Sequence, residues 1–442
     1  MVHQVVFLAL VLAAWLVQGQ FDNCGLSSNT RFLTFNRKLM STAPVLFPKT
    51  EAELKSIVKR AAQRGCKVRV RGAGHSSNGI IAQAAEKKVV VVHLGRLKTT
   101  AWPDSINAKT CVATIGTGKS LLGLIAMAKP AGCVHFTQTA FPLFSVGGVI
   151  SNSVTGNGHG AGMFYDYVVG VRVMLPSGEI RTITDESSLR FFRGAYGLTG
   201  IILSIKYQLK RDYQFQMKSL VHEYDFFNGG QAAYVALGTD QAVMLATYSG
   251  SECFMNVYPS QTTGKQSVTC FVLTQATTNQ TFPSGSSQDK ATQAELVSLY
   301  NKVKKQHPNL SYEGGKLVNV QSACDLIPAP FCNSKLTVSA GLMQSSTQVY
   351  NASWIAAGSA QGARDGYNQF TDLYPFTALA MFVPANNLVQ AVGAYVQIVG
   401  PFLGQGENAS WLPNLAFEWR PVTPKGSSAF DILVGGNYVL SD

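Results

Sequence analysis

Three glycine-rich segments in the first half of the chain constrain its fold more than any other feature. They span residues 72–79, 147–162 and 197–200 of a 442-residue chain that holds 41 glycines. Glycine has no Cβ, so the backbone there reaches left-handed conformations and comes close to other groups. Such segments interrupt regular elements and favour a fold with long, ordered loops.

Length and composition set the broad class. A chain of 442 residues exceeds what one hydrophobic core usually organises, so we expect two domains. With 46% hydrophobic and 14% charged residues, the chain is neither intrinsically disordered nor a coiled coil. The net charge is +12, but Lys and Arg are scattered singly or in pairs, which argues against a nucleic-acid partner.

The amino terminus predicts secretion. Residues 5–17 form an unbroken apolar run, too short to span a bilayer as a helix, followed by Val17-Gln18-Gly19. This pattern is typical of a signal peptide over residues 1–19, so we expect no stable membrane span; an uncleaved anchor or a buried helix is the alternative.

Cysteines and sequons agree with a secreted or luminal glycoprotein. The cysteine count is eight, four in each half, which makes disulfides within each half plausible but does not give their connectivity. The absence of CxxC or Cys/His spacing argues against a metal site. The second half holds four glycosylation sequons, at Asn279, Asn309, Asn351 and Asn408.

The pattern of elements in the first half is α+β. A capping box at Thr50 and Glu53 predicts a helix that ends at Gly65, and residues 120–129 predict a second helix. Strands are expected over 67–71, 89–93, 111–115, 167–175, 179–183 and 198–207. Strands and helices do not alternate regularly, which argues against a doubly wound sheet.

In the second half strand-like stretches dominate. We expect strands over 242–248, 270–273 and 376–383, and a long polar surface loop over 274–293. Leu388, Val392, Tyr395 and Val396 predict one face of a helix. The change of composition places a domain boundary near residue 210.

Another glycine motif resembles part of a phosphate-binding loop but does not match its full pattern. Residues 116–120 read Gly-Thr-Gly-Lys-Ser, like the end of a Walker loop, but that pattern needs a glycine where the chain has Ala113. We interpret the segment as a turn that leads into the helix over 120–129.

The segment Arg71-Gly72-Ala73-Gly74-His75-Ser76 is the strongest candidate for a binding loop. Glycines let backbone N–H groups converge on an anion such as a pyrophosphate. The dinucleotide pattern GxGxxG is absent, because Ser76 and Ser77 follow Gly74. Three permissive segments in one half favour an extended cofactor; a glycine-rich all-β fold with bulges is the alternative.

Four motifs in order resemble a known family. RVRGAGHSSNG, SVGGVISN with HGAG, DYVVGVRVMLPSGEI and GLTGIILSIKYQL are similar to the FAD-binding domain of vanillyl-alcohol-oxidase-type flavoproteins. The sugar-lactone oxidases (L-gulonolactone and D-arabinono-1,4-lactone oxidases) are most similar, and cytokinin dehydrogenases are also close. The resemblance implies an α+β chain: a two-subdomain PCMH-type FAD-binding domain over 40–211, then a substrate domain over 212–442 with an antiparallel sheet flanked by helices.

The resemblance also implies roles for residues that would bind FAD. Residues 71–77 would cradle its pyrophosphate, and His75 matches the position that bonds covalently to the flavin in many members. The full set is Arg71, Gly72, Ala73, Gly74, His75, Ser76, Ser77, Val146, Gly147, Gly148, Ser151, His159, Gly160, Gly200 and Ile201.

The catalytic residues of the relatives are not all present. Ala140 and Ala380 stand where relatives carry an acidic residue, and the terminal His-Trp-Gly-Lys of the lactone oxidases is absent, so either the sequence is cut short or its substrate site differs. Glu418 and Arg420 share one face of an expected strand and are catalytic candidates; an exposed salt bridge is the equal alternative.

The resemblance implies a secreted FAD-dependent oxidase of a sugar lactone, polyol or related hydroxyl compound, with dioxygen as acceptor and hydrogen peroxide as product. The alternative is a catalytically impaired secreted flavoprotein that acts in binding or defence. Nucleic-acid binding ranks last.

Overall fold

A computed structural model gives the fold. It describes residues 24, 32–33, 40–41, 45–76, 88–137, 144–156, 158–255, 263–275, 311–313, 316–318, 348–351, 381–403, 417–422, 425 and 438–441. The predicted leader (1–19), Ser77, Ala140, Ala380 and most of the predicted surface loop lie outside this part.

A small parallel sheet lies near the start of the described chain. Its order is β3 (Val45–Leu46), β5 (Val89–His93) and β4 (Lys67–Arg71), and helix α2 (Glu51–Gln63) connects β3 to β4. Thr50 caps α2 by accepting from the Glu53 amide, while the Glu53 carboxylate accepts from the Lys49 amide. The buried face of α2 packs with Val90 and Val92 of β5.

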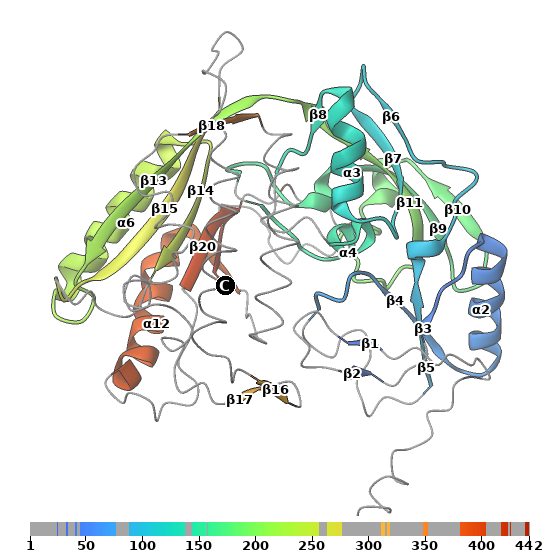
Figure 1. Cartoon of the computed structure of the whole chain (residues 1–442), viewed down its shortest axis with the longest axis horizontal. Coiled ribbons are helices and arrows are strands. Elements are labelled where there is room, and N and C mark those ends of the chain that lie inside the picture. Colours follow the sequence, from blue (N-terminus) through green and yellow to red (C-terminus); the bar gives the residue numbers. More distant parts are fainter. Residues whose placement is uncertain are drawn as a thin grey trace, which may run out of the picture.

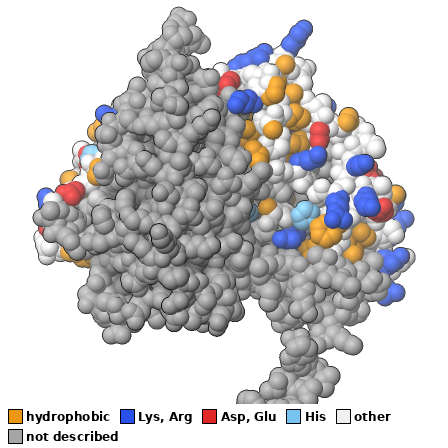
Figure 2. All heavy atoms as spheres, in the orientation of Figure 1, with side chains coloured by type: hydrophobic (Ala, Val, Ile, Leu, Met, Phe, Trp, Pro, Cys, Tyr) orange, Lys and Arg blue, Asp and Glu red, His pale blue; other side chains and the backbone are white. Residues whose placement is uncertain are grey.

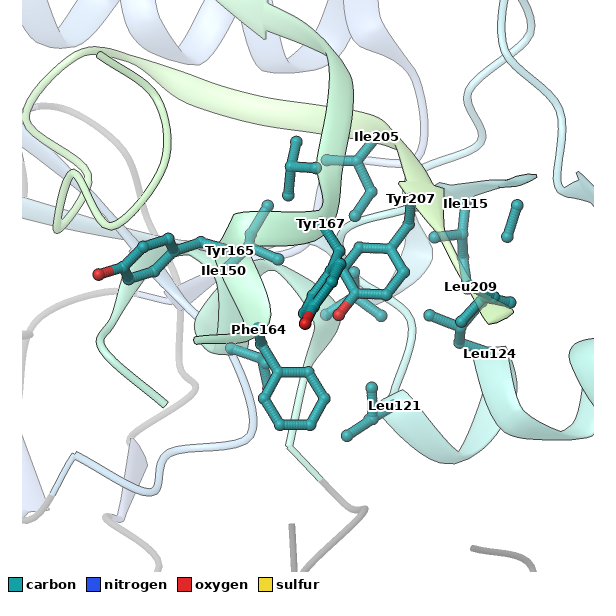
Figure 3. Close-up of a cluster of buried hydrophobic side chains, with 14 of the residues drawn as sticks. Ile115, Leu121, Leu124, Ile150, Phe164, Tyr165, Tyr167, Ile205, Tyr207 and Leu209 are labelled. Carbon is teal, nitrogen blue, oxygen red and sulfur yellow. The ribbon is translucent and has the colours of Figure 1, made fainter. Parts of the chain in front are cut away.

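A five-stranded antiparallel sheet forms the main core of the first half. Its order is β10 (Ile180–Ile183), β9 (Val168–Met174), β11 (Ile201–Gln208), β7 (Val112–Gly116) and β6 (Ser105–Asn107). Helices α3 (Leu121–Ala128) and α4 (Val146–Ser151) pack on it. In the core, Tyr167 and Tyr207 lie side by side with their hydroxyls directed towards Phe164 (Figure 3).

Short strands and helices are the other described elements up to residue 211. They are β1 (Phe32–Leu33), β2 (Met40–Ser41), η1 (Leu94–Arg96), η2 (Lys129–Ala131), β8 (Cys133–Val134), η3 (Phe164–Tyr167), α5 (Glu186–Leu189) and β12 (Lys210–Arg211).

A seven-stranded antiparallel sheet follows. Its order is β18 (Gln348–Asn351), β13 (Gln214–Tyr224), β15 (Gln266–Gln275), β14 (Gly250–Met255), β20 (Phe417–Val422), β21 (Tyr438–Ser441) and β19 (Met381–Pro384). Helices α6 (Gly230–Thr247) and α12 (Leu388–Leu403) cover its outer face (Figure 1). A hairpin of β16 (Ser311–Glu313) and β17 (Lys316–Val318) and the turn η6 (Ala385–Asn387) are the remaining described elements.

One expected strand is wrong. Residues 242–248 were expected to be a strand, but all except Tyr248 form the last turns of α6. Ala, Met and Leu are good helix formers, and the buried positions Ala233, Leu237, Gln241 and Met244 follow a helical spacing against the sheet. Other expected elements are confirmed, including α2, α3, α12 and the strands at 67–71 and 89–93.

Three disulfides lie in the described part. Cys24 bonds to Cys66, Cys111 to Cys133, and Cys253 to Cys270, so each pair stays within its half of the chain. Among the described helices, none is long and apolar enough to cross a membrane. Lys and Arg side chains are spread over the visible face of the first half (Figure 2).

The architecture is α+β, as expected. Mostly antiparallel sheets, one parallel sheet and a few helices replace any regular alternation of strand and helix. The boundary near residue 210 stays a prediction; β11 ends at Gln208, and β13 of the other sheet begins at Gln214.

Candidate functional site

The loop after β4 lies directly against the start of α4. A Cβ built on Gly72 would lie 2.0 Å from the Ser145 Oγ, so only glycine fits without displacing that side chain. The same Ser145 Oγ accepts from the Gly148 amide at 3.1 Å and caps α4. Gly74 has φ +85°, the left-handed region that glycine favours. The glycine loop and α4 are thereby brought together from distant parts of the sequence.

His75 sits beside this contact as a neutral ring. Its imidazole meets the Phe144 ring edge-on, with ring centroids 4.5 Å apart. Burial lowers the pKa of His75 from 6.5 to about 4, because desolvation disfavours the charged form. An uncharged imidazole nitrogen is what a nucleophilic His needs near neutral pH.

Basic groups gather at the carboxyl ends of β4 and β5. Arg71 is the last residue of β4 and pairs in register with His93, the last residue of β5. The pKa of His93 is lowered by burial and further by the charge of Arg71, and burial also lowers the pKa of Arg71. The Arg96 guanidinium lies 5.1 Å from the ring centroid of Phe47, which also packs on His93.

Sequence reasoning missed His93 and Arg96. The available signal was their place at the carboxyl end of a parallel strand, where ligands of α/β sheets commonly bind.

The predicted residues Val146, Gly147, Gly148 and Ser151 lie in the short helix α4. Its glycines still serve close packing: a Cβ on Gly147 would lie 3.1 Å from the Thr117 carbonyl oxygen. Thr117 belongs to the glycine turn before α3, which is capped by Ser120 and fits the turn expected there.

The third glycine segment packs against the same half. Gly200 has φ +141°, and a Cβ there would lie 2.8 Å from the Met174 carbonyl oxygen. Ile201 is buried in the core beneath the parallel sheet. Tyr196 donates its amide to the carbonyl of Ser151 at the end of α4, so this segment meets the helix as well.

His159 lies where the two halves of the chain meet. Its Nδ1 is 2.8 Å from the Tyr248 carbonyl oxygen and its Nε2 is 2.8 Å from the Ser251 Oγ. The neighbouring Gly158 forms a backbone bridge with Gly250, and Gly160 has φ +68°. Burial lowers the pKa of His159, while the bond to the Tyr248 carbonyl opposes that shift. Both ring nitrogens therefore face partners from the second half.

Of the two catalytic candidates, Arg420 has a described side chain. Its guanidinium donates to Glu252 Oε1 at 2.9 Å, and both side chains are 14% exposed. The backbone of Glu418 pairs in register with Phe254 of β14. Arg420 is thus in a largely buried ion pair with Glu252, a residue that sequence reasoning missed because it lies far away in the chain.

The described residues fit an extended anionic cofactor. Gly72 has no room for a Cβ, Arg71 is a cation at the base of its loop, and His75 is neutral. Residues 71–76 and 144–151 lie together, and the third glycine segment reaches the end of α4.

Comparison with known proteins agrees with this reading. Residues 42–184 match the family described as FAD binding domain. Berberine bridge enzyme-like 23 of Arabidopsis thaliana is 26% identical over 205 residues, which cover 44% of this chain and 37% of that protein. L-gulonolactone oxidase 3 of Arabidopsis thaliana is 24% identical over 249 residues, covering 51% and 42%.

A bacterial relative matches a similar share of this chain. Decaprenylphosphoryl-beta-D-ribose oxidase of Mycolicibacterium smegmatis is 30% identical over 189 residues, covering 40% of each chain. The matched regions of these three relatives span about two fifths of their length. The predicted resemblance to a PCMH-type FAD-binding domain is confirmed.

Proposed function

We propose that this chain, which carries a PCMH-type FAD-binding domain, is a secreted FAD-dependent oxidoreductase. It oxidises a hydroxyl group of a sugar lactone, polyol or related compound, and dioxygen accepts the electrons to give hydrogen peroxide. The family match over residues 42–184 and relatives named as oxidases support this class of reaction.

When bound, FAD supplies the acceptor for the hydride that leaves the substrate carbon. The protein's part is to bind and orient the cofactor and the substrate. Residues 71–77 would hold the pyrophosphate, and Val146, Gly147, Gly148 and Ser151 would lie along the cofactor. His159, Gly160, Gly200 and Ile201 complete the proposed set. Arg420, with Glu418 on the same strand, would supply charge near the substrate.

The observation that carries the proposal is the contact between the Gly72 loop and Ser145. It brings Gly72, which has no room for a Cβ, against the cap of α4, next to the cationic Arg71 and in the same loop as a neutral His75. We propose further that His75 bonds covalently to the flavin, since its unprotonated imidazole is a competent nucleophile.

The test is an absorbance spectrum of the purified protein before and after acid precipitation. We expect yellow wild-type protein that keeps its colour in the pellet, and a His75→Ala variant whose pellet is colourless. His222→Ala is the matched control, because His222 lies on β13 in the other sheet and pairs with Asp240 at 3.3 Å. Colourless wild-type protein would overturn the assignment of FAD, and a yellow His75→Ala pellet would overturn the covalent link alone.

A second candidate is a flavoprotein that binds a partner without turnover. It is favoured by Ala140 and Ala380, which stand where the resemblance expects acidic residues. Oxygen consumption with a panel of lactones, alditols and alcohols separates the two, because turnover with any of them excludes this candidate.

Secretion belongs to the same proposal. The three described disulfides are typical of proteins that fold in an oxidising compartment. The sequon residue Asn351 ends β18, at the edge of the seven-stranded sheet. A mobility shift on treatment of the secreted protein with an N-glycosidase tests this part.

A further inference from the structure

Oxidation of a hydroxyl group needs a base as well as a hydride acceptor. The carbon loses hydrogen with its electron pair, and the oxygen must lose a proton for the carbonyl to form. Ala140 and Ala380 carry no acid for that proton. If the proposed function holds, another group has to accept it.

The face of the seven-stranded sheet opposite its helices carries such a group. Side chains alternate along a strand, and Cys253 and Met255 of β14 are buried in the core with α6 and α12. Glu252 and Phe254 therefore lie on the opposite face. Cys253 pairs with Trp419, which is in the same core, so Arg420 shares the face of Glu252.

The geometry of Glu252 suits a proton acceptor. Its Oε1 accepts from the Arg420 guanidinium at 2.9 Å, and among the described residues Oε2 has no hydrogen-bond partner. The carboxylate is 14% exposed, so it is sheltered from bulk water while its charge is balanced by Arg420. One oxygen is fixed, and the other is left to accept a hydroxyl proton.

The same strand is anchored to the FAD-binding half. Gly250 bridges to Gly158, and the Ser251 hydroxyl meets the His159 ring. Glu252 is the next residue, and the Phe254 and Phe271 rings lie beside it on the same face, 5.9 Å apart. β14 and β20 lie on the side of the sheet nearer the first half (Figure 1).

From this placement we infer that Glu252 is the catalytic base and that Arg420 positions it. Glu252 Oε2 would accept the proton of the substrate hydroxyl as the carbonyl forms, and a bound flavin would supply the acceptor for the hydride that leaves the same carbon. The carbonyl product and a protonated Glu252 result, and the proton then passes to water. The inference rests on the proposed function.

The experiment compares Glu252→Gln and Glu252→Asp with Glu223→Gln. Glu223 is an exposed carboxylate on β13 of the same sheet and serves as the matched control. The probes are L-gulono-1,4-lactone and xylitol, mixed anaerobically with the oxidised protein in a stopped-flow spectrometer. Flavin content, thermal unfolding and the spectral change on donor binding are measured on the same samples.

We expect Glu252→Gln to slow flavin reduction roughly 10²–10⁴-fold, the usual contribution of a general base. Flavin content, unfolding temperature and donor binding stay as in wild type. Glu252→Asp, which keeps a carboxylate, recovers part of the rate, and Glu223→Gln behaves as wild type.

Three outcomes would overturn the inference. If Glu252→Gln reduces its flavin at the wild-type rate, the role of Glu252 is overturned and the proposed function stays intact. Loss of flavin or folding in both Glu252 variants assigns the residue a structural role. A flavin-bearing wild type that reacts with neither donor overturns the proposed function and this inference together.

Discussion

Among single residues, His135 is notable because its side chain is buried in the core and, within the described part of the chain, makes no hydrogen bond. The residue is 2% exposed, and neither ring nitrogen has a hydrogen-bond partner among the residues that the structure describes. Its ring packs 5.6 Å from both Phe164 and Tyr207, between the core residues of the five-stranded sheet. Burial lowers the pKa of His135 to about 4, because the charged ring would be desolvated.

This burial predicts a loss of stability in mild acid. The folded-state pKa of His135 lies below the unfolded value of about 6.5, so the unfolded chain binds the proton more tightly. The free energy of unfolding should be highest above pH 6.5. It should fall as the pH drops towards 4, and protonation of His135 should account for roughly 3 kcal/mol of this fall. Urea unfolding at several pH values measures it.

A His135→Phe variant should flatten that dependence, since it keeps an aromatic ring and removes the titrating group. His75 contributes a fall of the same sign, so some pH dependence remains in the variant. An equal slope in His135→Phe and wild type would contradict the prediction. His222→Phe on β13 is the control.

At the scale of elements, the glycines divide into those that packing requires and those that it does not. A Cβ on Gly118 would lie 2.1 Å from the Leu94 carbonyl oxygen, a backbone atom that cannot move aside alone. A Cβ on Gly123, inside α3, would meet only the Ser120 Oγ at 3.6 Å, an ordinary contact. Sequence alone shows both as glycines near one turn.

Substitution by alanine should therefore have opposite effects at these two sites. Gly118→Ala forces η1 and the turn before α3 apart and should cost about 1–3 kcal/mol, as overpacking does. Gly123→Ala should stabilise by about 0.5–1 kcal/mol, because alanine favours the helix. Thermal unfolding of the two variants gives the sign, and a shared sign would refute this division.

The sequence predicted local elements well and their interior contacts poorly. The capping residues of α2 were readable because a cap acts within one turn. Residues 242–248 were misread because an apolar run looks alike in a buried helix and a buried strand. The Glu252–Arg420 pair could not be read, since its partners meet only through the pairing of β14 with β20.

At the scale of the whole molecule, His159 connects the two halves of the chain where they meet, a contact that we call the seam. Its two ring nitrogens and its backbone amide all bond to residues 248–251. Lys425 reaches the other way, donating to the Tyr167 hydroxyl at 2.9 Å. The HGAG motif alone does not predict that its histidine forms hydrogen bonds with residues of the second half.

Removal of the His159 ring should loosen this seam. We expect His159→Ala to lower the free energy of unfolding by about 1–3 kcal/mol, because buried partners lose their hydrogen bonds. Denaturant unfolding followed by fluorescence and by flavin release measures it, with His222→Ala as control. Unchanged stability and unchanged flavin release would show that the seam is held elsewhere.

The disulfides have a consequence for the timing of folding. The described pairs are 42, 22 and 17 residues apart, and none joins the two halves. Oxidation of the first half needs no cysteine beyond Cys133. At about 5–20 residues per second of synthesis, those two bonds have seconds to a minute to close before residue 442 is made. The cofactor-binding half can thus be covalently complete while the sheet that carries Glu252 is still being translated.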